Sequence, residues 1–220
     1  MLPEKKGLGV ELWGSYQDVK QLYFVIMSFT DDESFQNREG FENRNQILWD
    51  FVKHLRKSYQ GRRLQRDTDH FNLDPQKVFG VKISWLEMIF YLGCINYNSK
   101  FLRVSKFDSA MFLQLEYWLE KSMIDYDEKG GNELKNYINS LINYNSELLL
   151  QYYHFLDYEF FKLNGGKKSY RKLFEILRKA VASSDENKLF LSKLNKEAKI
   201  LNCEIIDLLV YDDIDKFKMD

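Results

Sequence analysis

The 220-residue chain has only two cysteines, three histidines and two prolines, and these scarcities exclude several classes of site. Cys94 and Cys203 stand far apart without a second pair, which argues against a disulfide framework or a zinc site and fits a reducing compartment. His54, His70 and His154 do not occur at metal-ligand spacing from one another. We therefore predict no metal and no other cofactor.

The sequence also lacks a long hydrophobic run and an excess of one charge. The longest apolar run lies near MIFYLGCI, far short of the roughly 20 residues of a membrane-spanning helix, and the opening residues lack the apolar core of a signal peptide. The formal net charge is -1, so the whole molecule has no field that attracts nucleic acid or anionic lipid. We expect a cytoplasmic protein that does not enter the membrane.

Hydrophobic residues, in contrast, are abundant. They make up 45% of the chain and aromatic residues 16%, which is sufficient for one well-packed core, and no linker is visible. The sequence predicts a single globular domain over residues 1–220, with an acidic C-terminal tail from about residue 204.

Apolar residues repeat at helical spacing through most of the chain, which predicts about seven helices. Ser15 with Asp18, and Ser84 with Glu87, have the spacing of capping boxes at helix starts. The predicted helices cover residues 15–29, 42–59, 84–98, 108–129, 132–163, 168–183 and 185–202. The fourth is expected to begin at Asp108 and to end at Gly130 and Gly131, and the fifth to break near residues 143–146.

Two short segments show the two-residue alternation of strands, GLGVELWG and VFGVKIS, and GRRLQR is a candidate third strand. The predicted fold is mainly α (α+β): a helical bundle-like domain with a small antiparallel sheet or hairpin near the N-terminal half. The helix over residues 84–98 is apolar on nearly every side and is predicted to be central, with four side chains buried in the core: Trp85, Met88, Ile89 and Leu92.

Acidic residues crowd one loop, DTDHFNLD, which contains Asp67, Asp69, His70 and Asp74. The loop lacks the glycine and distal glutamate of an EF-hand, so we interpret it as a turn with helix caps.

Other candidates for chemistry are equally weak. Glu116 and Glu120 lie one helical turn apart without the Glu-x-x-His motif of di-iron proteins, and Cys94 lies in the most apolar segment. We predict no catalytic residue; an enzyme whose site is assembled from distant residues stays open as the least favoured alternative.

Two segments, 53–66 and 162–179, are rich in lysine and arginine. The first includes Arg62, Arg63 and Arg66, and the second includes Lys167, Lys168 and Arg171. If these clusters adjoined, they would form the positive surface of a nucleic-acid or phosphate-binding protein; otherwise each is a solvated face paired with nearby acids.

The second basic cluster contains LNGGKKSYRK, which resembles a phosphate loop at first sight. A Walker A loop needs a further glycine where Phe161 stands, so that interpretation fails, and a glycine pair is typical of a helix C-terminus. Lys167, Lys168, Ser169 and Arg171 nevertheless fall at the start of the next helix, where an anion is favoured. Either an anion, including an acidic side chain, binds there or the segment is only a connection.

Aromatic residues are dense over residues 144–161, with Tyr144, Tyr152, Tyr153 and Tyr158 on several faces. Exposed tyrosines commonly anchor protein interfaces, although a fully packed helix would explain the same pattern. The leading hypothesis is a non-enzymatic cytoplasmic protein that binds a protein partner or self-associates. The alternative is a nucleic-acid or phosphate-anion binding module that uses clusters 53–66 and 162–179.

Three segments, GVELWGSYQDVKQLYFVI, FENRNQILWDFVKHLRKSYQGRRL and FLQLEYWLEKSM, resemble an uncharacterised bacterial family of hypothetical proteins. The resemblance spans much of the chain but implies no activity and no site residue.

Overall fold

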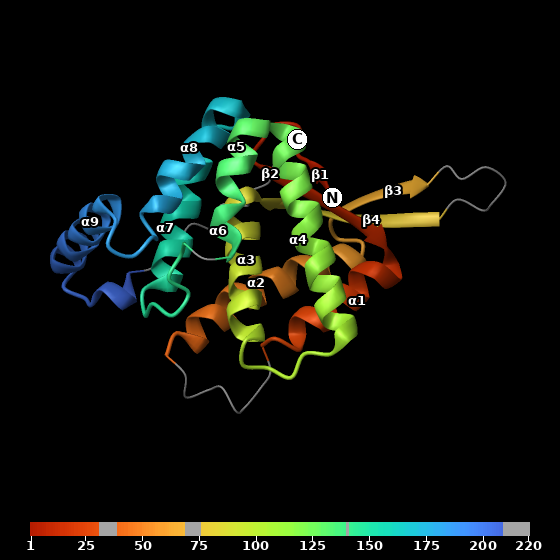
Figure 1. Ribbon diagram of the computed structural model, residues 1–220, viewed down its shortest axis with the longest axis horizontal. Helices are drawn as coiled ribbons and strands as arrows, with labels where there is room; N and C mark the ends of the chain where they lie inside the picture. Colours follow the sequence, from red (N-terminus) through yellow and green to blue (C-terminus); the bar gives the residue numbers. More distant parts are fainter. Residues whose placement is uncertain (31–38, 69–75, 140, 209–220) are drawn as a thin grey trace.

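The computed structural model describes residues 1–30, 39–68, 76–139 and 141–208, and within them it forms a mainly helical α+β fold (Figure 1). The strands are β1 (Leu2–Pro3), β2 (Gly9–Ser15), β3 (Leu64–Thr68) and β4 (Gln76–Ser84). The helices are α1 (Tyr16–Met27), α2 (Phe41–Tyr59), α3 (Trp85–Ser99), α4 (Lys106–Tyr126), α5 (Glu128–Leu134), α6 (Asn136–Asn139), α7 (Leu149–Phe161), α8 (Gly166–Arg178), α9 (Asp185–Leu201) and the 3-10 helix η2 (Ile205–Asp207). The predicted fold class is confirmed.

The four strands form one antiparallel sheet in the order β1-β2-β4-β3. The two strands predicted from alternation, β2 and β4, are neighbours, and their pairing runs from Gly9 opposite Ser84 to Ser15 opposite Val78. A Cβ on Gly9 would lie 2.0 Å from the Ile83 carbonyl oxygen, so only glycine permits this close approach. The GRRLQR segment supplies the start of β3, as predicted.

Both predicted capping boxes are present, and each joins a strand directly to a helix. The Ser15 hydroxyl accepts a hydrogen bond from the Asp18 N–H (3.2 Å), and the Ser15 N–H donates to the Asp18 carboxylate (2.9 Å). Ser84 and Glu87 form the same reciprocal pair, with both distances 2.9 Å. Each box provides acceptors for two backbone N–H groups at the start of its helix. The chain therefore passes from β2 into α1 and from β4 into α3 without a loop.

Helix α3 lies at the centre of the core. It contacts α2, α4, α6 and α7 and the strands β2 and β4. The side chains of Trp85, Met88, Ile89 and Leu92 are all 0% exposed, which confirms the predicted central helix. An apolar helix of this kind needs neighbours on every side, and the fold provides them.

The predicted boundaries of α4 were wrong at both ends. The helix begins at Lys106, capped by the Ser105 hydroxyl, so Asp108 is its third residue. It ends at Tyr126, and Gly130 and Gly131 lie inside the short helix α5 instead of ending α4. A Cβ on Gly131 would lie 2.6 Å from the Met123 carbonyl group, so the glycine lets α5 fold back against the end of α4.

The C-terminal half follows the predicted order of elements. The expected break falls between α6 and α7, and α8 begins at Gly166, two residues earlier than predicted. The acidic tail is described only as far as Leu208, which is buried, and its remaining residues lie outside the described part of the chain. Within the described ranges, no helix combines the length and apolar composition that a bilayer span requires.

Candidate functional site

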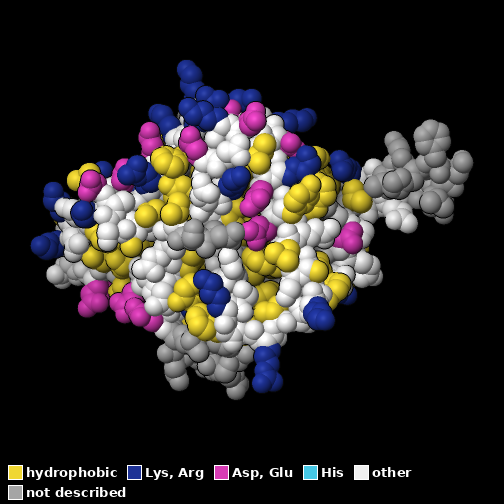
Figure 2. Space-filling model, viewed as in Figure 1, with side chains coloured by type: hydrophobic (Ala, Val, Ile, Leu, Met, Phe, Trp, Pro, Cys, Tyr) yellow, Lys and Arg dark blue, Asp and Glu magenta, His cyan; other side chains and the backbone are white. Residues whose placement is uncertain are grey.

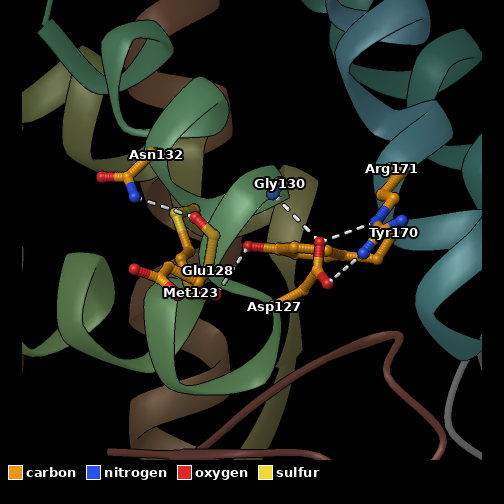
Figure 3. A network of polar contacts seen from close by, with 7 residues as sticks. All are labelled: Met123, Asp127, Glu128, Gly130, Asn132, Tyr170 and Arg171. Carbon is orange, nitrogen blue, oxygen red and sulfur yellow. Dashed lines mark hydrogen bonds and ion pairs between the residues drawn. The ribbon is translucent and has the colours of Figure 1, made fainter.

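The predicted anion site at the start of α8 contains an acidic side chain of the protein itself (Figure 3). The Arg171 guanidinium donates two hydrogen bonds to the Asp127 carboxylate, Nε to Oδ2 at 2.8 Å and Nη2 to Oδ1 at 2.6 Å. Asp127 also caps α5 by accepting the Gly130 N–H at 3.0 Å. The hydrogen bonds from Arg171 hold the pKa of Asp127 down at about 2, so the carboxylate is charged at neutral pH.

The other predicted residues of this site are divided between core and solvent. The Ser169 hydroxyl is buried and donates to the Leu163 carbonyl at 2.7 Å, while the side chains of Lys167 and Lys168 are exposed. The Gly166 N–H donates to the Lys6 carbonyl at 2.7 Å, which satisfies one of the first N–H groups of α8. In the structure the segment joins α7 to α8, and Asp127 is the anion that Arg171 contacts.

The two basic clusters lie on different elements, cluster 53–66 on α2 and β3 and cluster 162–179 mainly on α8. Figure 1 shows β3, at the end of cluster 53–66, well separated from α8, which carries most of cluster 162–179. In the first cluster Arg62 is exposed, Arg63 is half-buried, and the Arg66 guanidinium stacks 4.5 Å from the centre of the Trp13 ring.

Within cluster 162–179, acids of neighbouring helices engage several of the cations. Lys179 binds Glu159 (2.6 Å from Nζ to Oε2), and Arg178 binds Glu186 (3.0 Å from Nε to Oε1). These ion pairs reduce the positive charge that is free to meet a phosphate backbone.

Of the four candidate interface tyrosines, three are buried and one is half-buried, so three of them fit the fully packed alternative. Tyr144, Tyr152 and Tyr153 are 5%, 5% and 1% exposed, because they pack against α3 and α9. Their hydroxyl groups find internal partners: Ile89 O for Tyr144, Asn187 Nδ2 for Tyr152 and the Tyr91 hydroxyl for Tyr153. Tyr158 is half-buried, with the Lys162 ammonium 3.9 Å from its ring centre.

The sequence candidates for chemistry lie on different elements, with Asp67 on β3 and Cys94 on α3. Asp69, His70 and Asp74 lie outside the described residues. In the described ranges, no group of three or more His, Cys, Asp or Glu side chains is placed to hold a metal ion. Cys94 is fully buried, and this burial raises the pKa of its thiol, which disfavours the nucleophilic thiolate.

Several large hydrophobic side chains are exposed on the outer face of α4. Phe107, Leu113, Tyr117 and Trp118 on this one helix are 51%, 62%, 58% and 39% exposed, while its inner face buries Leu115, Leu119 and Met123. Figure 2 shows hydrophobic side chains spread over the part of the surface that α4 forms. We call these four exposed residues the α4 stripe.

Two hollows lie between α1 and α4, beside the α4 stripe. The first has a volume of about 340 Å³, and its lining includes Trp13, Leu22, Met111 and Trp118. The second has a volume of about 450 Å³ and is lined by residues that include Phe24 and Phe107. Trp118 and Phe107 thus belong both to the stripe and to the hollows, whose linings mix apolar with polar side chains such as Gln114 and Gln21.

The apolar spacing predicted a helix in this segment but did not indicate that one of its apolar faces is exposed. The sequence did contain a signal for it. Leu113 and Tyr117 do not lie on the buried face formed by Leu115, Leu119 and Met123, so α4 has apolar residues on two faces. A helix of this kind either lies inside a core or offers one face to a partner.

A mainly helical α+β protein with an exposed apolar helix face is the class that these observations define. The sequence model of a family described as a domain of unknown function (DUF6904) matches residues 3–218, and the chain belongs to this family. Comparison with curated proteins and with solved structures gave no match.

Proposed function

We propose that this protein is a non-enzymatic cytoplasmic interaction module that binds another protein chain through the α4 stripe and the adjoining hollows. The observation that carries the proposal is the exposure of four large apolar side chains on one helix. Soluble proteins rarely expose large apolar patches, and such patches commonly mark interaction sites.

The composition of the stripe supports a protein partner. Tyr117 and Trp118 pack edge to face with ring centres 5.2 Å apart, and aromatic residues of this kind are enriched among the residues that dominate binding energy. Trp118 also lines the first hollow, so a side chain of the partner could enter this hollow while the rest of the partner covers the α4 stripe. Phe24, 58% exposed, extends the apolar surface across the second hollow.

The alternative prediction, a module for nucleic acid or phosphate anions, has less support. Arg171, Arg178 and Lys179 have acidic partners, and Arg66 stacks on Trp13. Cluster 53–66 and cluster 162–179 also lie apart (Figure 1). Binding through either cluster alone would involve few phosphate contacts and hence be weak at physiological salt.

A photoreactive phenylalanine analogue in place of Tyr117 tests the proposal in the native host. Irradiation should give a defined adduct, because this side chain is 58% exposed at the centre of the stripe. The matched control carries the analogue at Ile200 on α9, which is 81% exposed and far from α4. No adduct at position 117, or the same adducts at both positions, would contradict the proposal.

A further inference from the structure

We propose that the partner of the α4 stripe is a second copy of this chain, with the two α4 helices packed antiparallel across a twofold axis at Leu113. This inference rests on the proposed function and names its partner. The reason is a self-complementary pattern of charge and shape along the outer face of α4.

Lys106, Leu113 and Glu120 stand seven residues apart, so they lie two turns from one another on the same side of the helix. A twofold axis that relates two antiparallel helices brings a residue before the centre opposite the residue equally far after it. With the axis at Leu113, each leucine meets its own copy. Lys106 of each chain then meets Glu120 of the other, and the contact occurs twice.

Each end of α4 gains from this arrangement. Lys106 lies in the first turn, where the positive end of the helix dipole favours a nearby carboxylate. Glu120 is half-buried; burial and the neighbouring Glu116 raise its pKa, and Lys135 offsets part of this effect. A second cation opposite Glu120 would stabilise its charged form. A parallel pair would instead place Lys106 against Lys106 and Glu120 against Glu120.

The apolar side chains follow the same symmetry. On the other edge of the outer face, Phe107 stands six positions before Leu113 and Trp118 five positions after it, so each phenylalanine falls near the tryptophan of the other copy. Between the edges, the small Ala110 lies three positions before Leu113 and leaves room for Tyr117, four positions after it. Large side chains thus face small or complementary ones, which is what close helix packing needs.

Charge exchange tests the pairing. Lys106→Glu and Glu120→Lys, singly, should each raise the dimer dissociation constant about tenfold, because two facing attractions become repulsions. The double variant restores opposite charges and should dimerise like the wild type. Sedimentation equilibrium over a range of concentrations measures this, and circular dichroism checks that each variant is folded. Lys196→Glu, an exposed change on α9, is the control and should leave dimerisation unchanged.

A cysteine at the axis gives a second, independent readout. In a Cys203→Ser background, Leu113→Cys should form a disulfide between two copies on mild oxidation, whereas Leu189→Cys, 67% exposed on α9, should not. A wild type that stays monomeric at all concentrations, or a double charge variant as weak as the single ones, overturns the antiparallel dimer. The photo-adduct at position 117 separates the two proposals. An adduct of twice the 26.5 kDa chain mass supports self-association. An adduct with a partner of another mass overturns the dimer but supports the α4 stripe as an interaction surface.

Discussion

Arg171 on α8 and Asp127, the residue between α4 and α5, are joined by two short hydrogen bonds although they are far apart in sequence. Asp127 at the same time accepts the Gly130 N–H and so starts α5. One carboxylate therefore ties the corner between two helices to a third helix (Figure 3).

This pair predicts a dependence of stability on acid. The pKa of Asp127 lies at about 2 in the folded protein, below its ordinary value of 3.8. Its stabilising contribution is therefore present above about pH 4 and is lost as the pH falls towards 2. Asp127→Asn lacks this contribution, so the difference in unfolding free energy between wild type and variant should shrink over that range. A difference that is constant with pH in urea titrations would show that the pair does not act through charge.

Phosphate should not bind at the start of α8. The Arg171 guanidinium already donates to the Asp127 carboxylate, and the Gly166 N–H already donates to the Lys6 carbonyl. The amide NMR signals of Ser169 and Tyr170 are expected to stay in place at millimolar phosphate. Asp127→Asn is the informative comparison, since it releases Arg171 beside Lys167 and should create a weak anion site. A saturable shift in the wild type would contradict this view of the segment.

Ile89→Ala should lower the free energy of unfolding by about 2–5 kcal/mol, because the side chain is 0% exposed on the central helix. The control, Ile200→Ala, removes the same atoms from a side chain that is 81% exposed and should change stability by less than about 0.5 kcal/mol. Chemical denaturation measures both. Equal losses of unfolding free energy in the two variants would show that Ile89 does not lie in the core.

Gly93→Ala should destabilise the protein by about 1–3 kcal/mol through overpacking. A Cβ at this position of α3 would lie 1.9 Å from Cζ of the Tyr144 ring, and both residues are inside the core. Combining the change with Tyr144→Leu should recover part of the loss, which a double-mutant cycle detects as a coupling energy. Strict additivity of the two changes would mean that the ring moves away without cost.

Random oligonucleotides should bind weakly or not at all at physiological salt, because the two basic clusters do not combine. Fluorescence anisotropy over a salt series measures this. The charge reversals Arg62→Glu, Arg63→Glu and Arg66→Glu together should leave the titration unchanged. Tight binding by the wild type that these reversals abolish would revive the nucleic-acid alternative.

Elements encoded by neighbouring residues could be predicted from the sequence. Ser15 and Ser84 mark helix starts because a capping box needs only residues three apart, and the alternation of β2 and β4 is equally local. The burial of Trp85, Met88, Ile89 and Leu92 on α3 was predictable because no polar face of this helix competes for burial. In each case the local sequence pattern favours the same helix, strand or buried position that the tertiary structure requires.

Features that depend on distant segments could not be predicted. A tyrosine that packs inside, such as Tyr153, and one that meets solvent, such as Tyr117, have the same local signal, and only the positions of α3 and α9 distinguish them. The Asp127 partner of Arg171 was expected only as some acidic group, because the pairing depends on how α8 lies against the corner of α4 and α5. The α4 stripe is exposed because no other described segment covers it, which the sequence of α4 alone does not reveal.

The hydrogen bond from the Gly166 N–H to the Lys6 carbonyl has a consequence for synthesis on the ribosome. The loop around Lys6 is also held by the Trp85 indole, which donates to the Gly7 carbonyl at 3.2 Å, and a Cβ on Gly165 would lie 2.3 Å from the Lys6 oxygen. Lys6 is translated long before Gly166, so this one contact of the N-terminal loop can form only after residue 166 has left the exit tunnel. Until then the Lys6 carbonyl lacks the Gly166 N–H that it accepts in the folded chain.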